Sequence, residues 1–318
     1  MAQTKIKTNI KKVSDHISVF QRGKYKWINI TKRDRATVDY LRKEFQINQD
    51  DAEDTLPPLE RSKILVRNNY LFLVLVFPIE KGNKAIHPSD VDFFIFKDVV
   101  VTIHTNNLEP LKDFPIEIIN LNSVNAFQPP FVINHILEHL YEYCLPISNK
   151  LSTEIDKIES KIYKIELANK ELIQGVFSLD REVIDFRKIM RTHKVIIEKL
   201  VTHLPKMTAK DSYPHDTLSD LREWPISVWT HLESHMEAID ALQNTYESLT
   251  SYRLNEVIKT LTIISVIISP LALISGIFGM NFRFIPFATH PAGFLVTVLL
   301  MLIFSVLGIL FFKKRNWL

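Results

Sequence analysis

Short apolar runs alternate with turn residues over the first part of the chain. The runs are rich in β-branched and aromatic residues, which is typical of strands. They cover residues 17–20, 26–30, 70–77, 91–96 and 99–104. Between them, Thr37–Gln46 and Asp50–Asp54 have helical patterns. The pattern predicts an α/β domain with a mixed sheet over residues 1–125.

From residue 126 onward the apolar spacing becomes helical. Ile147, Leu151, Ile155 and Ile158 recur every three or four positions, as in coiled coils. We expect long helices packed as hairpins over residues 126–258, with a break near 204–214. Pro225 suits the first turn of the last helix, which continues as a stalk into the C-terminal apolar region.

Two long uncharged stretches follow. Between Lys259 and Arg283 lie 23 uncharged residues, and between Arg283 and Lys313 lie 29. A hydrocarbon core needs about 20 residues, so each stretch can cross a bilayer. The expected order is a transmembrane helix at 259–281, an extracellular loop at 282–290, a second transmembrane helix at 291–312 and a basic cytoplasmic tail at 313–318. The outer ends of this hairpin carry Lys259 and the basic tail, whereas the loop has Arg283 alone. Because basic residues favour the cytoplasmic side, both termini are expected in the cytoplasm.

Several functional classes do not fit this composition. The net charge is +3 and basic residues are interleaved with acids, so nucleic-acid binding is not expected. The seven glycines are scattered and form no phosphate loop, which argues against nucleotide-driven pumping. His135–His139 fits an H-x-x-E-H pattern and His231 and His235 have metal-binding spacing, but no third ligand is marked. We expect no enzyme and no organic cofactor.

One face of the first predicted span carries mostly small or hydroxyl-bearing residues. Taken every three or four positions, it reads Asn255, Ile258, Thr262, Ser265, Ser269, Ala272, Gly276 and Gly279. Such a face either packs closely against another membrane helix or lines a path for ions. The second interpretation requires a homo-oligomer, because one two-span chain cannot enclose a pore. No acid follows Glu256, so a divalent cation would keep its hydration shell there.

The segment Gly276-Ile-Phe-Gly-Met-Asn-Phe282 resembles the Tyr/Phe-Gly-Met-Asn motif of CorA magnesium transporters, which ends the first of two C-terminal spans. The resemblance extends to Asn255–Ile264, to Pro270 and to the basic and aromatic ending, and the order of parts covers the whole chain. It implies an α+β membrane protein that forms a funnel-shaped homopentamer in the inner or plasma membrane. Such a protein mediates passive uptake of Mg²⁺, with Co²⁺ or Ni²⁺ as further ions, under the control of intracellular Mg²⁺.

The resemblance also implies roles for single residues. Gly279, Met280 and Asn281 form the selectivity filter, where a ring of Asn281 side chains selects hydrated Mg²⁺. Ile258 and Leu261 form a hydrophobic constriction near the cytoplasmic end. Asp220 falls at the position of a regulatory carboxylate, although a surface or capping role fits it equally well. The implied pore-lining positions are Asn255, Ile258, Leu261, Ser269, Ala272 and Asn281.

Two departures from the family pattern leave alternatives open. The loop has Phe284-Ile-Pro-Phe287 where the family commonly has Met-Pro-Glu-Leu, so no loop acid concentrates cations. Ala272 stands where the family usually has a hydroxyl group. A zinc transporter of the same superfamily is one alternative, although Met280 favours the magnesium branch. A non-transporting two-span sensor or scaffold is another.

Overall fold

The computed structural model describes residues 8–58, 61–82, 85–121, 124–164, 170–208, 215–280 and 290–317. The chain divides into two compact units, Met1–Ala241 and Leu242–Leu318. One helix, α7 (His215–Phe278), begins in the first unit and ends in the second.

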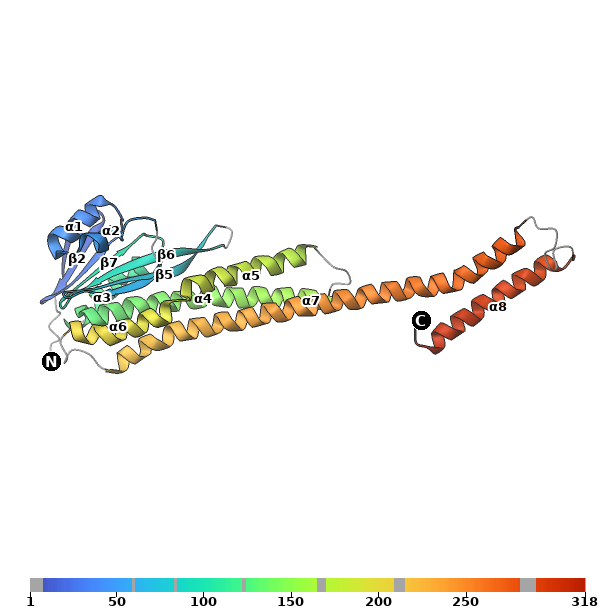
Figure 1. The fold of residues 1–318 in the computed structure, drawn as a ribbon. Helices are drawn as coiled ribbons and strands as arrows, with labels where there is room; N and C mark the ends of the chain where they lie inside the picture. The colour runs from blue at the N-terminus through green and yellow to red at the C-terminus, as the bar shows by residue number, and fades with distance from the viewer. Residues whose placement is uncertain are drawn as a thin grey trace. The chain divides into compact units, whose positions relative to one another are not determined.

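The first unit contains a seven-stranded mixed sheet (Figure 1). Its strands are β1 (Asn9–Ser14), β2 (Ile17–Arg22), β3 (Tyr25–Ile30), β4 (Lys63–Val66), β5 (Leu71–Lys81), β6 (Ala85–Ile95) and β7 (Val99–His104). They lie in the order β1-β2-β3-β7-β6-β5-β4. Only β3 and β7 pair in parallel, and the other neighbours are antiparallel. The predicted mixed sheet is confirmed.

The sequence pattern missed the two edge strands for a physical reason. All six residues of β1 are exposed, so no alternation of buried and exposed positions marks it. The strand β4 has only four residues, and none of them is fully buried. An edge strand pairs on one side only and needs little apolar burial, so its signal in the sequence is weak.

Two short helices cover one face of the sheet, as Figure 1 shows. Helix α1 (Arg35–Phe45) begins at Asp34, whose side chain accepts a hydrogen bond from the backbone N–H of Thr37 at 2.9 Å. It ends at Gln46, which has a left-handed φ of 54°. Helix α2 (Gln49–Glu53) follows after three residues. Val38 and Leu41 of α1 are buried in the apolar core beneath these helices.

Longer helices cover the opposite face of the sheet (Figure 1). They are α4 (Pro129–Lys164), α5 (Lys170–Met190) and α6 (His193–Met207), preceded by α3 (Pro110–Asn120) and the 3-10 turn η1 (Val124–Phe127). The buried His193 joins three elements: its Nε2 donates to the carbonyl of Val76 at 2.8 Å, and its Nδ1 lies 2.9 Å from the Tyr141 hydroxyl. Burial lowers the pKa of His193 to about 4, so the ring is neutral near pH 7.

The start of α7 differs from the prediction. The helix begins at His215, so Pro225 lies in its interior and not in its first turn. A proline there removes one backbone hydrogen bond. Leu221, Val228 and Leu232 around it are completely buried. Their burial stabilises the helix across the proline by more than the lost bond costs.

The second unit is a hairpin formed by the C-terminal part of α7 and by α8 (Gly293–Lys314). Both helices are long and apolar enough to cross a membrane. Large apolar side chains along them are exposed, including Leu273 at 65% and Phe294 at 79%. Such exposure is unfavourable in water and neutral in hydrocarbon. The two predicted spans lie on these two helices.

Candidate functional site

Helix α8 contacts one particular face of α7. On α7, Ile263 is buried, and Ile267, Leu271 and Ile274 are partly buried. On α8, the residues with reduced exposure are Gly293, Thr297, Met301, Ser305, Gly308 and Phe312. The contact between the two spans therefore sets branched apolar residues of α7 against a face of α8 with four small residues and two large ones, Met301 and Phe312. Small residues at such contacts are common where membrane helices pack.

Gly308 of α8 lies close to α7. A Cβ atom built on this glycine would lie 3.3 Å from Cγ1 of Ile267. This separation is tighter than an ordinary carbon–carbon contact, so a larger residue would push the helices apart. Gly308 therefore sets the spacing between α7 and α8.

Gly308→Val is expected to destabilise the hairpin by about 1–3 kcal/mol, the usual cost of overpacking. Thermal unfolding of the full chain in detergent measures this effect. Val306→Leu, at a position that is 54% exposed, is the matched control and should leave the unfolding temperature unchanged. Equal unfolding temperatures for the two variants would contradict the role of Gly308 in setting the distance between the helices.

The residues predicted to line a pore lie on a different face of α7. We call this set the candidate pore face. Its described members, all exposed, are Asn255, Ile258, Leu261, Thr262, Ser265, Ser269, Ala272 and Gly276. With about 100° between successive residues, none of them falls on the face that contains Ile263 and Ile267. The small residues of this face therefore do not pack against α8 of the same chain.

The hydroxyl groups of this segment present oxygen atoms outward. Thr262 donates its hydroxyl proton to the carbonyl of Ile258 at 2.7 Å, and Thr260 donates to Glu256 at 2.9 Å. A hydroxyl whose proton is used within the helix acts toward its surroundings as an acceptor. Water molecules in the first shell of a cation point their protons outward. Acceptor oxygens such as that of Thr262 therefore suit a hydrated cation.

Helix α7 ends next to the Gly-Met-Asn motif that begins at Gly279. Gly279 N–H donates to Ser275 at 2.9 Å, and Met280 N–H donates to Ile277 at 3.2 Å, which completes the last turn. The C-terminus of a helix carries a partial negative charge and favours a nearby cation. Asn281 lies outside the described residues, as does the loop through residue 289. Gly279 and Met280 are described, and Met280 is 50% exposed.

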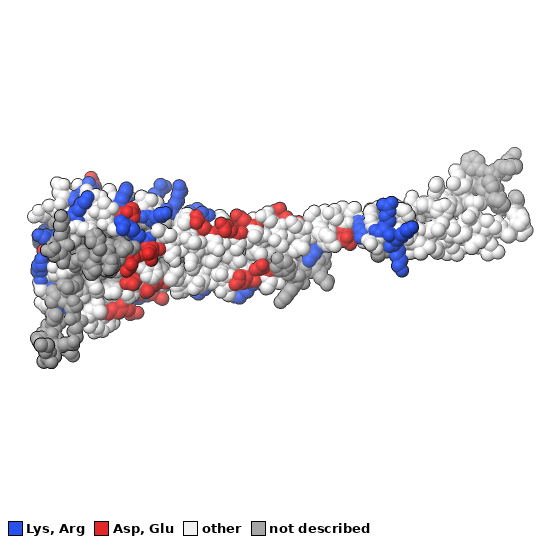
Figure 2. Space-filling view, turned by 90° about the horizontal axis from the view of Figure 1, so that it is seen from below, with Lys and Arg blue, Asp and Glu red and all other residues white. Residues whose placement is uncertain are grey.

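Charged residues in the described part of the second unit lie near one end of the hairpin. Glu256 and Lys259 form an ion pair at 3.6 Å, and Lys313, Lys314 and Arg315 follow the end of α8. Figure 2 shows basic side chains gathered in this region and uncharged residues over the rest of the hairpin's described surface in view. This distribution fits a membrane-spanning segment with a basic band at one interface.

Asp220 is exposed on α7. Among the residues that the structure describes, no three or more His, Cys, Asp or Glu side chains form a group that could hold a metal ion. One copy of the chain therefore does not build a cation site around Asp220 from its described part.

Three of the four histidines in these patterns lie beside polar groups, and the fourth, His231, is exposed. His139 Nε2 lies 2.8 Å from Glu117, and His135 Nδ1 lies 3.2 Å from Glu138. His235 Nε2 lies 2.9 Å from the Ser148 hydroxyl, where α7 packs on α4. These contacts hold the rings of His135, His139 and His235 beside groups of the first unit.

Comparison with known proteins identifies the family. A family model described as CorA-like Mg²⁺ transporter protein matches residues 22–314. The chain belongs to the CorA family. The cobalt/magnesium transport protein CorA of Thermotoga maritima is 27% identical over 296 residues, which are 92% of this chain and 83% of that protein. The magnesium transport protein CorA of Wolinella succinogenes is 25% identical over 301 residues, or 92% and 91% of the two chains.

The fold agrees with this assignment. The complete structure of the CorA magnesium transporter from Methanocaldococcus jannaschii superposes with a TM-score of 0.82 at 20% identity and covers 98% of both chains. The present chain thus has the whole CorA fold: an N-terminal α/β domain, a long helix and two C-terminal candidate spans. It is a membrane protein of a transporter family.

Two features of the structure were not found from the sequence. The first is the contact face of α8, which residues four apart could have indicated: Gly293, Thr297, Met301 and Ser305. The second is a buried charged cluster in the α/β domain, formed by Arg33, Asp90 and Asp92. No local pattern joins these three residues, because Arg33 and Asp90 are 57 positions apart.

Proposed function

We propose that this chain is a divalent-cation transporter that carries Mg²⁺, and also Co²⁺, passively across the inner or plasma membrane as a homopentamer. One observation carries the proposal: α8 covers the face of α7 that contains Ile263 and Ile267, and it leaves the candidate pore face exposed. Polar, uncovered residues within a membrane-spanning helix are stabilised when they surround a water-filled path. Five copies of α7 around an axis provide such a path.

The ion moves with its hydration shell. Hydroxyl oxygens of the candidate pore face, the partly negative end of α7 and a ring of Asn281 amides contact the shell waters, since no carboxylate follows Glu256. Gly279 and Met280 hold the turn that carries Asn281. Ile258 and Leu261 form the apolar constriction that closes by excluding water. A membrane potential favours inward movement of a dication by about 4.6 kcal/mol per 100 mV.

Intracellular Mg²⁺ controls this path in our proposal. Asp220 of one copy and acids of the neighbouring copy bind Mg²⁺ between cytoplasmic domains, and both termini are cytoplasmic. When Mg²⁺ falls, the bridging ions leave and like charges face each other. The equilibrium between closed and open protein then moves toward the open state. The size of this shift is set by the difference in Mg²⁺ affinity between the two states.

The oligomeric mass in detergent tests the assembly. Five copies of the 37.0 kDa chain are expected, and light scattering with correction for bound detergent measures the mass. A stable monomer would contradict the pore and favour the two-span scaffold. The oligomeric mass of two variants provides a comparison. Gly308→Val disturbs the hairpin and should weaken assembly more than Val306→Leu does.

A further inference from the structure

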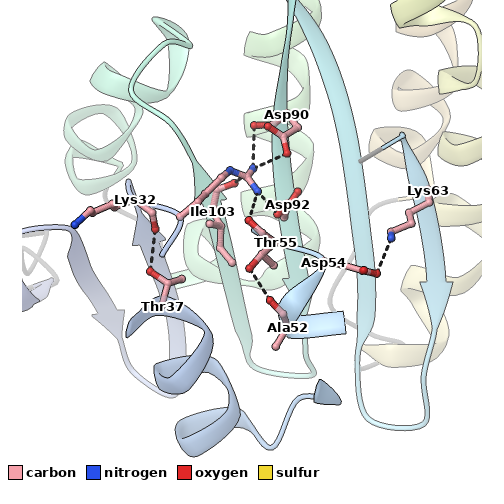
Figure 3. Close-up of polar contacts among 10 residues, drawn as sticks. Lys32, Thr37, Ala52, Asp54, Thr55, Lys63, Asp90, Asp92 and Ile103 are labelled. Atoms are coloured by element: carbon pink, nitrogen blue, oxygen red, sulfur yellow. Dashed lines mark hydrogen bonds and ion pairs between the residues drawn. The ribbon is translucent and has the colours of Figure 1, made fainter. Parts of the chain in front are cut away.

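A charged cluster is buried between α2 and the sheet of the first unit. Arg33, in the connection before α1, lies against Asp90 and Asp92 of β6, and the three side chains are only 3%, 4% and 1% exposed. Figure 3 shows the two aspartates close together, with Thr55 and Ile103 beside them. The cluster takes no part in the proposed ion path.

The hydrogen bonds of the cluster are incomplete. Arg33 Nη1 donates to Asp92 Oδ2 and to the carbonyl of Thr55, while Nη2 lies 3.1 Å from Asp90 Oδ2 and donates to Ile103 at 3.0 Å. The Oδ1 atoms of Asp90 and Asp92 are buried and have no hydrogen-bond partner among the described residues. Two carboxylates and one guanidinium leave one uncompensated negative charge. Burying such a charge is costly, and a neutral carboxyl group is the less costly form.

We propose that the Arg33–Asp90–Asp92 cluster binds one proton in the folded protein, carried by Asp92, and that losing this proton as the pH rises weakens the attachment of the end of α2 to the sheet. Arg33 is the link, because the same guanidinium that neutralises the aspartates also holds the carbonyl of Thr55, just after α2. A second negative charge draws Arg33 toward β6 and away from Thr55. This inference does not depend on the transport function.

Among the described residues, the other charged groups around the cluster are paired or neutral, and the charge of Lys63 also acts on Asp92, whose pKa it lowers less than burial raises it. On β4, Lys63 binds Asp54 of the α2 end at 2.6 Å. On β7, burial lowers the pKa of His104 to about 4, so its ring is neutral. From α1, Arg35 lies 3.8 Å from Glu53 of α2, and both are exposed. On β5, the residues paired with Asp90 and Asp92 are Val76 and Val74.

A metal ion is a poorer occupant than a proton. The guanidinium of Arg33 already fills the space between the two carboxylates and would repel a cation. The described residues also contain no group of three or more metal-binding side chains. A proton needs only one carboxylate oxygen.

The expected pH dependence follows from the direction of the pKa shifts. Burial raises the pKa of Asp92 to about 7 and also raises the pKa of Asp90. The folded state therefore holds a proton that the unfolded chain has already released above about pH 4. The stability from this group is complete below about pH 4, falls progressively as the pH rises, and is gone above about pH 7. His104 and His193 act in the opposite direction, so a comparison of variants is needed to isolate Asp92.

Infrared spectra of the full chain in detergent test the proposal directly. Raising the pH from about 5 to about 9 should remove the carbonyl band of a protonated, buried carboxyl group from the wild type. Asp92→Asn should lack this pH-sensitive band. Asp98→Asn, which removes an exposed partner of Lys24, should keep it. An unchanged band in Asp92→Asn would overturn the assignment.

Two further measurements keep the test decisive. The unfolding temperature of the wild type, relative to Asp92→Asn, should fall as the pH rises from about 4 to about 7 and level off above. A constant difference between about pH 4 and about pH 7 would contradict the proposal. If Asp92→Asn does not fold, Asp90→Asn replaces it. Removing the charge of Asp90 should lower the pH at which the band disappears, because that charge raises the pKa of Asp92. No change in that pH would overturn the proposal.

Discussion

Ser269→Leu is expected to reduce Mg²⁺ flux through the assembled protein to less than about a tenth, because a bulky apolar side chain narrows and dries the ion path. Ser269 lies in the middle of the candidate pore face, and its side chain is exposed and uncovered by α8. In a pentamer the substitution places five leucines at one level of the path. Mg²⁺ uptake into liposomes that contain the purified variant measures the effect.

Ile264→Phe is the matched control for added bulk on the same helix. Ile264 is 47% exposed and lies on neither the candidate pore face nor the face that contacts α8. Its enlarged side chain should point into lipid and leave the flux near the wild-type value. If both variants transport normally, or if both lose transport while remaining assembled, the candidate pore face is assigned to the wrong side of α7.

Arg33→Met is expected to destabilise the α/β domain by about 3–5 kcal/mol above neutral pH, because it leaves buried carboxylates without a compensating charge. The substitution preserves most of the side-chain volume, so packing alone changes little. The buried Trp27, stacked on Phe20 in the same domain, contributes a fluorescence signal for unfolding. Denaturant unfolding of the full chain, followed by this signal, measures the change.

Lys24→Met is the control for losing a positive charge in this domain. Lys24 forms an exposed ion pair with Asp98 at 3.1 Å, and exposed pairs contribute little to stability. Its loss should not move the unfolding midpoint measurably. A midpoint for Arg33→Met that matches that of Lys24→Met would show that the buried cluster is not a structural requirement.

Local patterns in the sequence were sufficient for much of the fold. Strands β5, β6 and β7 have long apolar runs because they lie in the interior of the sheet, covered by helices on both faces. The two spans are marked by apolar stretches of 23 and 29 uncharged residues. These features follow from hydrophobic burial, which depends on the residue type and its spacing.

Features that depend on distant contacts were not predictable in this way. Pro225 is an acceptable first-turn residue, and only the burial of Leu221 explains why the helix starts earlier. The pairing of Arg33 with Asp92 requires β6 and the connection before α1 to meet through the sheet order. For the candidate pore face, the spacing of small residues left two interpretations. The position of α8 on Ile263 and Ile267 shows that this face does not pack α8 of the same chain, and pore lining stays a prediction.

The role of Asn281 remains a prediction, since the residue lies outside the described part of the chain. Gly279 and Met280 bring the chain to the end of α7, where the carbonyl groups favour cations. The absence of acids after Glu256 makes an amide ring a chemically reasonable way to select a hydrated ion.

Divalent-cation uptake into liposomes tests the central claim most directly. Purified wild-type protein should admit Mg²⁺ and Co²⁺ under an inward-directed electrical gradient, and Asn281→Ala should lose or deregulate this flux while still assembling. Zinc uptake without magnesium uptake would contradict the proposed ion. Normal, selective Mg²⁺ uptake by Asn281→Ala would contradict the proposed filter, and no cation uptake by the assembled wild type would contradict transport itself.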